Sequence, residues 1–168
     1  MRLLNTFWVL RQNYGEITNQ FDMKKLIKSQ HFVSCPWGGW GVSRQNVVDG
    51  VYNETPCGEK GRRPSNKQDR KFVEEMKIGD IVLIPFTGSK ECIVARITSD
   101  VEYAIDTGLN WNEEREQISI GENDGLPFRP VGRYIEILCD DFIPDKSLGQ
   151  WTLSKMNEEL KSKLIASI

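Results

Sequence analysis

The segment FVEEMKIGDIVLIP, residues 72–85, decides the fold class because it joins a predicted helix to a predicted buried strand. Phe72, Val73 and Met76 recur at the spacing of one helix face, and charged residues occupy the other face. Gly79 stands where a glycine commonly ends a helix. The apolar run that follows Asp80 is typical of a strand covered on both faces. We therefore expect this helix face to pack on a core that contains the strand.

Shorter apolar runs on either side of this segment predict the remaining elements. A turn at Gly88 leads into residues 92–97, which we expect to form a hairpin with the strand after Asp80. Further strands are predicted at residues 7–10, 31–35, 101–105 and 129–138. Helices are predicted at residues 22–29 and 152–168, and the helix before Gly79 begins at a Ser-x-x-Gln capping box, residues 65–68. Residues 51–63 and 107–124 are predicted loops.

These elements indicate the fold class. Short strands and a few helices, without alternating β-α-β units, favour an α+β fold over a doubly wound sheet. The 168 residues fit one domain, residues 1–168, that can bury a substantial core. The architecture that fits best is a small, partly open β-barrel flanked by helices.

Charge is distributed unevenly along the chain. The formal net charge is -2, which argues against binding a polyanion with the whole surface. Between Lys60 and Lys77 there are seven basic and three acidic residues, whereas between Asp100 and Asp124 eight acidic residues accompany Arg115 alone. A basic stretch on an acidic chain suits a protein that contacts nucleic acid with one face. A solvated surface loop is the alternative interpretation.

Few side chains are suited to catalysis or metal binding. His31 is the single histidine, and the four cysteines have no C-x-x-C spacing, so we expect free thiols, no metal and no cofactor. Glu75-x-Lys77 matches half of a restriction nuclease site, but a helix end lacks the strand and the metal-binding aspartate that such chemistry requires. Asp140 and Asp141 are expected in a solvated turn. We predict no catalytic residues.

No apolar span reaches membrane length, and polar residues interrupt the apolar N-terminus, which therefore lacks the form of a signal peptide. These features predict a cytoplasmic protein with no membrane partner.

The aromatic residues suggest a binding function. Two indoles and three glycines lie within residues 37–41. This composition predicts a rigid loop that presents an aromatic face to a ligand. Proteins that read a single base extrude it and stack it between aromatic side chains, while arginine and lysine hold the phosphates. The predicted base pocket comprises Trp8, Trp37, Trp40 and Tyr103. The predicted phosphate contacts are Arg11, Arg62, Arg63, Lys67 and Arg70. Alternatively, at least half of the aromatic residues fill the barrel core.

Several of these motifs together resemble the domain at the N-terminus of many Mrr-type restriction endonucleases. The strand Phe7-Trp8-Val9-Leu10-Arg11 is similar to the Trp-x-x-Arg strand that opens that domain, and residues 32–38 resemble its apolar strand ending in Trp-Gly. Residues 72–82 match its helix ending in Phe-x-x-x-Met-Lys-x-Gly-Asp-x-Val. Ile97 to Tyr103 and Arg129-Pro130-Val131 resemble later parts of the domain. The resemblance covers roughly residues 6–140, but the loop of residues 37–40 and the insertion of residues 51–63 are longer than expected, and no nuclease domain follows.

The resemblance implies a fold and a function. The helix–Gly-Asp–strand signature is similar to that of EVE, YTH and other PUA-like domains, which bind modified or flipped bases. It implies a PUA/EVE-like barrel that reads bases, plausibly in DNA and in restriction, defence or phage biology, and it does not imply cleavage. A separate nuclease or ATPase chain would be the effector partner. Binding of a small ligand such as a nucleotide, or a role as a protein-interaction module, remains the alternative.

Overall fold

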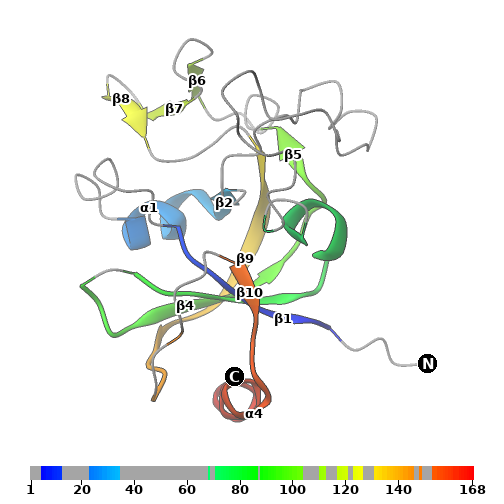
Figure 1. The fold of residues 1–168 in the computed structure, drawn as a ribbon. Helices are drawn as coiled ribbons and strands as arrows, with labels where there is room; N and C mark the ends of the chain where they lie inside the picture. Colours follow the sequence, from blue (N-terminus) through cyan, green and yellow to red (C-terminus); the bar gives the residue numbers. More distant parts are fainter. Residues whose placement is uncertain are drawn as a thin grey trace.

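The computed structural model describes residues 5–12, 23–34, 68, 71–86, 88–103, 110–112, 117–120, 123–126, 131–145, 148 and 153–168 (Figure 1). The strands in these ranges are β1 (Phe7–Leu10), β2 (Phe32–Ser34), β3 (Ile81–Ile84), β4 (Cys92–Ile97), β5 (Glu102–Tyr103), β6 (Asn110–Asn112), β7 (Gln117–Ile120), β8 (Asn123–Leu126), β9 (Val131–Phe142) and β10 (Leu153–Lys155). The helices are α1 (Met23–Gln30), α4 (Glu158–Ser167) and the π-helix η2 (Lys71–Glu75).

A seven-stranded sheet organises the molecule. Its strands lie in the order β10-β1-β3-β4-β9-β2, and β5 pairs with β9 beside this path. β1 and β3 are parallel, while the other pairs described in this sheet are antiparallel. Figure 1 shows β9 rising from the level of β4 toward β2 and β5. The sheet therefore curls into a partly open barrel, and the fold class is α+β as the sequence predicts.

β9 connects the two parts of this barrel because it changes partners along its length. Its first residues pair with β2 and β5, so that Gly132 lies opposite both Ser34 and Glu102. Its later residues pair with β4, from Ile135 opposite Ile97 to the end of the strand. The register between β4 and β9 shifts twice in this second part. Such irregularities increase the bend of a strand, which helps the sheet to curl.

Side chains alternate between two cores on the two faces of the sheet. Trp8 and Leu10 of β1 belong to the first core, inside the curl, whereas Val9 belongs to the second. β3 and the first four residues of β4 alternate in the same way, and this is why these stretches read as continuous apolar runs. The first core also receives Met23 and Ile27 from α1. The barrel is thus filled by side chains from strands and helices together.

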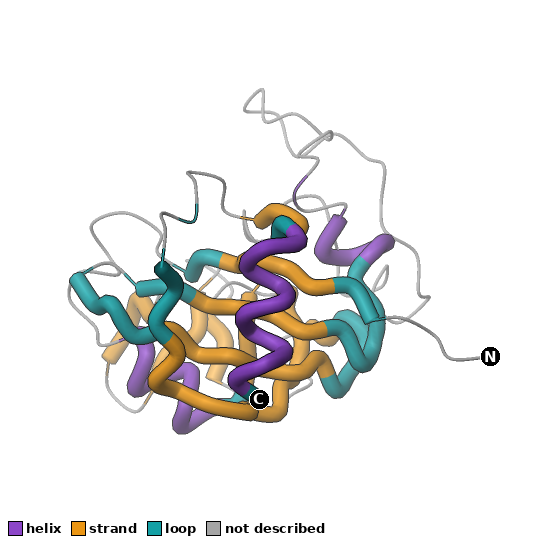
Figure 2. Tube along the Cα trace, turned by 90° about the horizontal axis from the view of Figure 1, so that it is seen from below, coloured by secondary structure: helices purple, strands orange, loops and turns teal. Residues whose placement is uncertain are grey.

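α4 covers the second core on the outer face of the sheet. Leu164 of α4 is fully buried there, and Leu160 packs against the same cluster. Figure 2 shows the helix lying across the strands. Its first turn is capped by Asn157, whose side-chain oxygen accepts a hydrogen bond from the Leu160 N–H at 2.8 Å. Among the described helices, none is long and apolar enough to cross a membrane.

The predictions around the deciding segment are confirmed. Phe72 and Met76 are buried in the first core, and residues 81–84 form β3 between β1 and β4. Gly79 and Gly88 have φ angles of 94° and 80°, in the left-handed region that favours glycine. β1 has its predicted bounds, and α1 and β2 differ from theirs by one residue at each end.

Residues 107–124, in contrast, are not simply a loop. β6, β7 and β8 form a separate three-stranded antiparallel sheet there, with Trp111 opposite Ile118. These strands are three or four residues long and mostly polar. Their sequences contain no apolar run that would predict strands. Whether such polar segments pair depends on their neighbours across the hairpin.

Two further predictions near the C-terminus are corrected. The helix predicted over residues 152–168 is divided: β10 pairs with β1 at the edge of the sheet, and α4 begins only at Glu158. Leu153 and Leu164 fit one helical spacing, yet they are buried in different cores. Asp140 and Asp141 lie within β9 and not in a turn, because β9 continues to Phe142, which packs in the second core.

Candidate nucleic-acid interface

The helix predicted before Gly79 is a π-helix, and its hydrogen bonds explain why. The Met76 N–H donates to the Lys71 carbonyl at 2.8 Å, one residue further back than in an α-helix. The Lys77 N–H donates to the Asp80 carboxylate at 2.9 Å. In an α-helix these two amides would bond to the carbonyls of Phe72 and Val73. Both carbonyls therefore need another donor.

Arg133 of β9 supplies that donor. Its guanidinium donates to the carbonyls of Phe72, Val73 and Met76 at 2.9 to 3.2 Å, and to the Ser99 carbonyl at 3.1 Å. The residue is only 2% exposed, and its Cζ atom lies 5.5 Å from the centre of the Phe72 ring. Arg133 thus fixes η2, which directly follows the predicted phosphate contact Arg70. We did not single out Arg133 from the sequence, although a charged residue inside an apolar strand is an unusual signal.

Asp80 holds the other side of η2 and changes the interpretation of Trp8. Its carboxylate accepts hydrogen bonds from Thr6 N at 2.9 Å, Trp8 Nε1 at 3.0 Å and Lys77 N at 2.9 Å, and the residue is 3% exposed. Trp8 is itself 1% exposed and belongs to the first core. The assignment of Trp8 to a base pocket is corrected: its indole is packed and its N–H is satisfied, so the ring offers no open face to a base.

Gln12 links β1 to β2 through its side chain. Its Oε1 atom accepts from the Ser34 N–H at 2.8 Å, and its Nε2 atom donates to the Ser34 carbonyl at 3.0 Å. These two bonds imitate the pair of N–H···O=C hydrogen bonds that two opposed residues of neighbouring antiparallel strands form with each other. Both residues are fully buried. The amide therefore closes the barrel between β1 and β2, which are not neighbours in the described sheet. We found no signal for this role in the sequence.

Several strand ends meet around the Gln12–Ser34 amide pair. Ser34 ends β2, and Gly132 near the start of β9 lies opposite it. A Cβ atom on Gly132 would come within 2.3 Å of the Val33 carbonyl and 2.4 Å of the Phe32 ring, so the close contact of these strands requires glycine. β5 borders the same place, because its last residue, Tyr103, pairs with Val131.

The predicted site residues are only partly described. Trp37 and Trp40 lie outside the described residues, as do Arg62, Arg63, Lys67 and Arg70. Tyr103 is described through its backbone pairing alone. Arg11 follows β1 directly, is half-buried, and has a buried Nε atom. The structure thus brings Arg11 and the backbone of Tyr103 to strand ends that border Ser34, three residues before Trp37.

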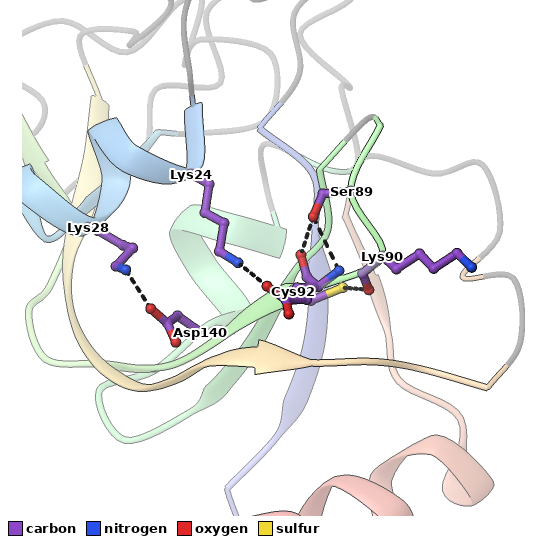
Figure 3. Close-up of polar contacts among 7 residues, drawn as sticks. Lys24, Lys28, Ser89, Lys90, Cys92 and Asp140 are labelled. Atoms are coloured by element: carbon purple, nitrogen blue, oxygen red, sulfur yellow. Dashed lines mark hydrogen bonds and ion pairs between the residues drawn. The ribbon is translucent and has the colours of Figure 1, made fainter.

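Two lysines of α1 form ion pairs with residues at β4 and β9. Lys24 and Lys28 are one helical turn apart, and Figure 3 shows both side chains pointing from α1 toward β4 and β9. The Lys24 Nζ atom lies 3.3 Å from Glu91 Oε2, and Lys28 forms an ion pair with Asp140. The hydrogen bond and charge of Lys28 hold the pKa of the Asp140 carboxyl below its ordinary value, and Lys24 adds a smaller effect. These lysines belong to none of the motifs that the sequence singles out.

Cys92 lies next to the Lys24–Glu91 pair. Burial raises the pKa of its thiol to about 11, although the charges of Lys24 and Arg11 act in the opposite direction. The thiol is therefore protonated at neutral pH and is a poor nucleophile. The end of β1, which leads to Arg11, and the start of β4, next to the Lys24–Glu91 pair, lie at the same end of the barrel.

The contacts that the described part of the chain makes with the candidates for catalysis are structural ones. Glu75 is exposed at the end of η2, and Lys77 Nζ donates to the Glu74 carbonyl at 2.9 Å. His31 is exposed between α1 and β2 with a φ angle of 53°, and its carbonyl accepts from the Ile135 N–H at 2.9 Å. Within the described ranges, His, Cys, Asp and Glu side chains form no group of three or more that could hold a metal ion.

Comparison with known proteins gives little further information. No family model matches the sequence, and no curated protein matches it. Among solved structures, that of a hypothetical protein from Leishmania major is similar over 97% of this chain and 94% of its own. The two sequences are 11% identical and the TM-score is 0.41, so this likeness carries no functional argument.

Proposed function

We propose that the protein is a non-catalytic nucleic-acid-binding module with a PUA/EVE-like barrel, and that it reads a modified or flipped base in DNA. The extruded base would stack on Trp37 and Trp40, with Tyr103 as a further wall of the pocket. Cations of the segment between Lys60 and Lys77 would hold the phosphates. Trp8 has no direct part in this mechanism and supports the barrel instead.

The anchoring of Ser34 by Gln12 is the observation that carries this proposal. A base-stacking wall is more effective when its backbone is already fixed, because ordering a loop on binding lowers the affinity. Gln12 fixes both backbone polar groups of Ser34. Trp37 follows three residues later, and three residues span at most about 11 Å. The chain that leads to Trp37 therefore starts from a fixed point of the barrel.

The fixed position of η2 supports the proposed phosphate contacts. Lys67 and Arg70 precede this helix in the sequence, and Arg133 and Asp80 hold its carbonyls and its following amide. Cations that emerge from a fixed element lose less entropy on binding than cations in a long loop. The basic segment is therefore tied to the barrel at its C-terminal end.

Acting alone, such a module would be a sensor, an adaptor or a competitor for sites in a restriction, defence or phage system. Cleavage would require a partner chain with a nuclease or ATPase activity, because Glu75 and Lys77 lack the strand setting and the metal-binding aspartate of a nuclease site.

A binding titration tests the proposal. Wild-type protein is titrated onto labelled DNA duplexes with and without a modified base, and onto single strands, at two salt concentrations. Trp37→Ala or Trp40→Ala should weaken binding about 5- to 150-fold, since stacking contributes about 1 to 3 kcal/mol per base. Arg62→Ala combined with Arg63→Ala should instead weaken binding to all sequences alike and flatten the salt dependence by about two contacts.

The outcome separates the proposal from its alternative. If the wild-type protein binds none of these nucleic acids even at low salt, the proposal is wrong, and binding of a small ligand or of a protein takes its place. An apolar ligand pocket would show little dependence on salt, whereas phosphate neutralisation gives an affinity that falls steeply with salt.

A further inference from the structure

We propose that the lysine face of α1, formed by Lys24, Lys25 and Lys28, is a second phosphate-contact surface for the nucleic acid. This inference rests on the proposed function and names a surface that the basic segment between Lys60 and Lys77 does not include. It would bind the sugar-phosphate backbone without regard to sequence, on the side of the barrel where β1 ends.

The composition of α1 is the first observation. The helix MKKLIKSQ carries three lysines and no acidic residue, although the chain as a whole has a net charge of -2. Met23 and Ile27 are buried in the first core. Successive residues turn by about 100° in a helix. Lys24 and Lys28 therefore flank the buried face and point toward β4 and β9, whereas Lys25 lies opposite the buried face and is exposed.

The position of α1 is the second observation. A single residue, His31, separates α1 from β2, and β2 ends at Ser34, where Gln12 anchors it. Val9 of β1 lies opposite Leu83, and Ile84 lies opposite Ile93, so the end of β1 and the start of β4 share one end of the barrel. Lys24 reaches that end through Glu91, which directly precedes β4. The lysine face therefore adjoins the strand end that leads to Trp37. A nucleic acid bound at that strand end would bring its sugar-phosphate backbone close to the lysines of α1.

The carboxylates beside this face show what it can bind. Lys24 lies 3.3 Å from Glu91, and Lys28 pairs with Asp140, so each ammonium group already holds one anionic oxygen (Figure 3). The Lys28 and Asp140 side chains are 46% and 42% exposed. Ion pairs this exposed contribute little to stability, so a phosphate can replace the carboxylate at small cost. Glu91 and Asp140 would then compete with phosphate for the lysines. Neutralising one of these carboxylates should therefore raise the affinity for DNA, whereas removing the lysines should lower it.

The experiment compares two pairs of lysines with the same charge change. Lys24→Gln with Lys28→Gln removes two cations of α1. Lys161→Gln with Lys163→Gln removes two cations of α4, on the outer face, where Lys163 pairs with Asp145. Binding to a labelled, unmodified DNA duplex is measured at two salt concentrations. The α1 variant should bind about tenfold more weakly at low salt, with a salt slope smaller by about 1.8, and the α4 variant should change by less than about twofold.

A second pair of variants tests the predicted increase in DNA affinity. Asp140→Asn should tighten binding to the same duplex about threefold, because it removes an anion that competes with phosphate for Lys28. Asp145→Asn, the matched change beside α4, should leave the affinity unchanged. A merely structural role of Lys28 would not produce tighter binding when its partner is neutralised. Thermal melting of each variant shows whether it is folded.

The possible outcomes separate the α1 surface from the base-reading proposal. Equal losses in the two lysine pairs, or no loss in the α1 pair, would refute this surface while leaving the base-reading proposal in place. Binding of plain duplex that depends on α1, without any preference for a modified base, would refute base reading and support the surface. Failure of the wild-type protein to bind any duplex or single strand would refute both.

Discussion

The strands β1, β3 and β4 are held together differently from the region formed by β2, η2 and the start of β9. In the first region, backbone ladders run over consecutive residues, and apolar side chains alternate between two cores. In the second region, β2 pairs with the start of β9 over three residues, and three buried polar side chains make the further connections: Gln12, Asp80 and Arg133. Each of these further connections depends on one side chain and not on a repeated pattern.

This difference has a consequence for stability. In a ladder, the removal of one apolar side chain leaves the backbone bonds intact. A polar tie that loses its side chain leaves buried donors or acceptors without partners, and these cost more than the lost bond itself. The second region should therefore be the more sensitive to single polar substitutions. Asp80→Ala and Gln12→Ala test this directly, while Phe72→Ala and the labelling of Cys92 provide comparisons.

Asp80→Ala should have the largest effect. It removes the acceptor of Thr6 N, Trp8 Nε1 and Lys77 N at once. An unsatisfied buried donor costs about 1 to 3 kcal/mol, so the free energy of unfolding should fall by about 4 to 6 kcal/mol in urea denaturation. Asp80→Asn keeps one carbonyl acceptor and should lose less. A loss below about 1 kcal/mol for the alanine variant would show that the polar ties are dispensable.

Phe72→Ala comes next, and it probes packing in the same helix. Phe72 is fully buried in the first core. Its truncation should lower the free energy of unfolding by about 3 to 5 kcal/mol, measured in the same way. Val73→Ala is a suitable comparison, because Val73 is only half-buried and should lose less. An effect below about 1 kcal/mol at Phe72 would mean that the helix face is misassigned.

Gln12→Ala should have a smaller and more local effect of about 1 to 3 kcal/mol. It frees the backbone groups of Ser34 and opens the barrel between β1 and β2. Hydrogen exchange measures this directly: the Ser34 amide should exchange faster, while the Val82 amide in the ladder between β1, β3 and β4 should keep its protection. Equal acceleration at both amides would contradict the division into two regions.

The smallest effect concerns Cys92, at the start of β4. Burial raises the pKa of its thiol to about 11 from the ordinary 9.0. Since the folded state favours the protonated thiol, its contribution to stability is complete below pH 9 and is lost as the pH rises toward 11. Alkylation with iodoacetamide at pH 8, mapped by mass spectrometry, should label Cys92 only after denaturation. Rapid labelling of the native protein would mean that the start of β4 opens readily.

The site was less predictable than the strands. The resemblance to a PUA-like reader and the aromatic composition of residues 37–41 remain the basis for the proposed pocket, and they await the binding tests. For Trp8 the sequence offered an early tryptophan in an apolar strand, a pattern that fits both a core and a pocket. Its partner, Asp80, lies 72 residues away, and that contact assigned the indole to the core.

By itself, the sequence determined the elements whose signal is local. The apolar run after Asp80, the helix face of Phe72 and Met76, and the turns at Gly79 and Gly88 all follow from patterns within a few residues. Only the tertiary structure decided that η2 is a π-helix, that β1 lies parallel to β3 and that Gln12 closes the barrel. The physical reason is distance along the chain: Arg133 lies 57 to 61 residues from the carbonyls of Phe72, Val73 and Met76, and Gln12 lies 22 residues from Ser34.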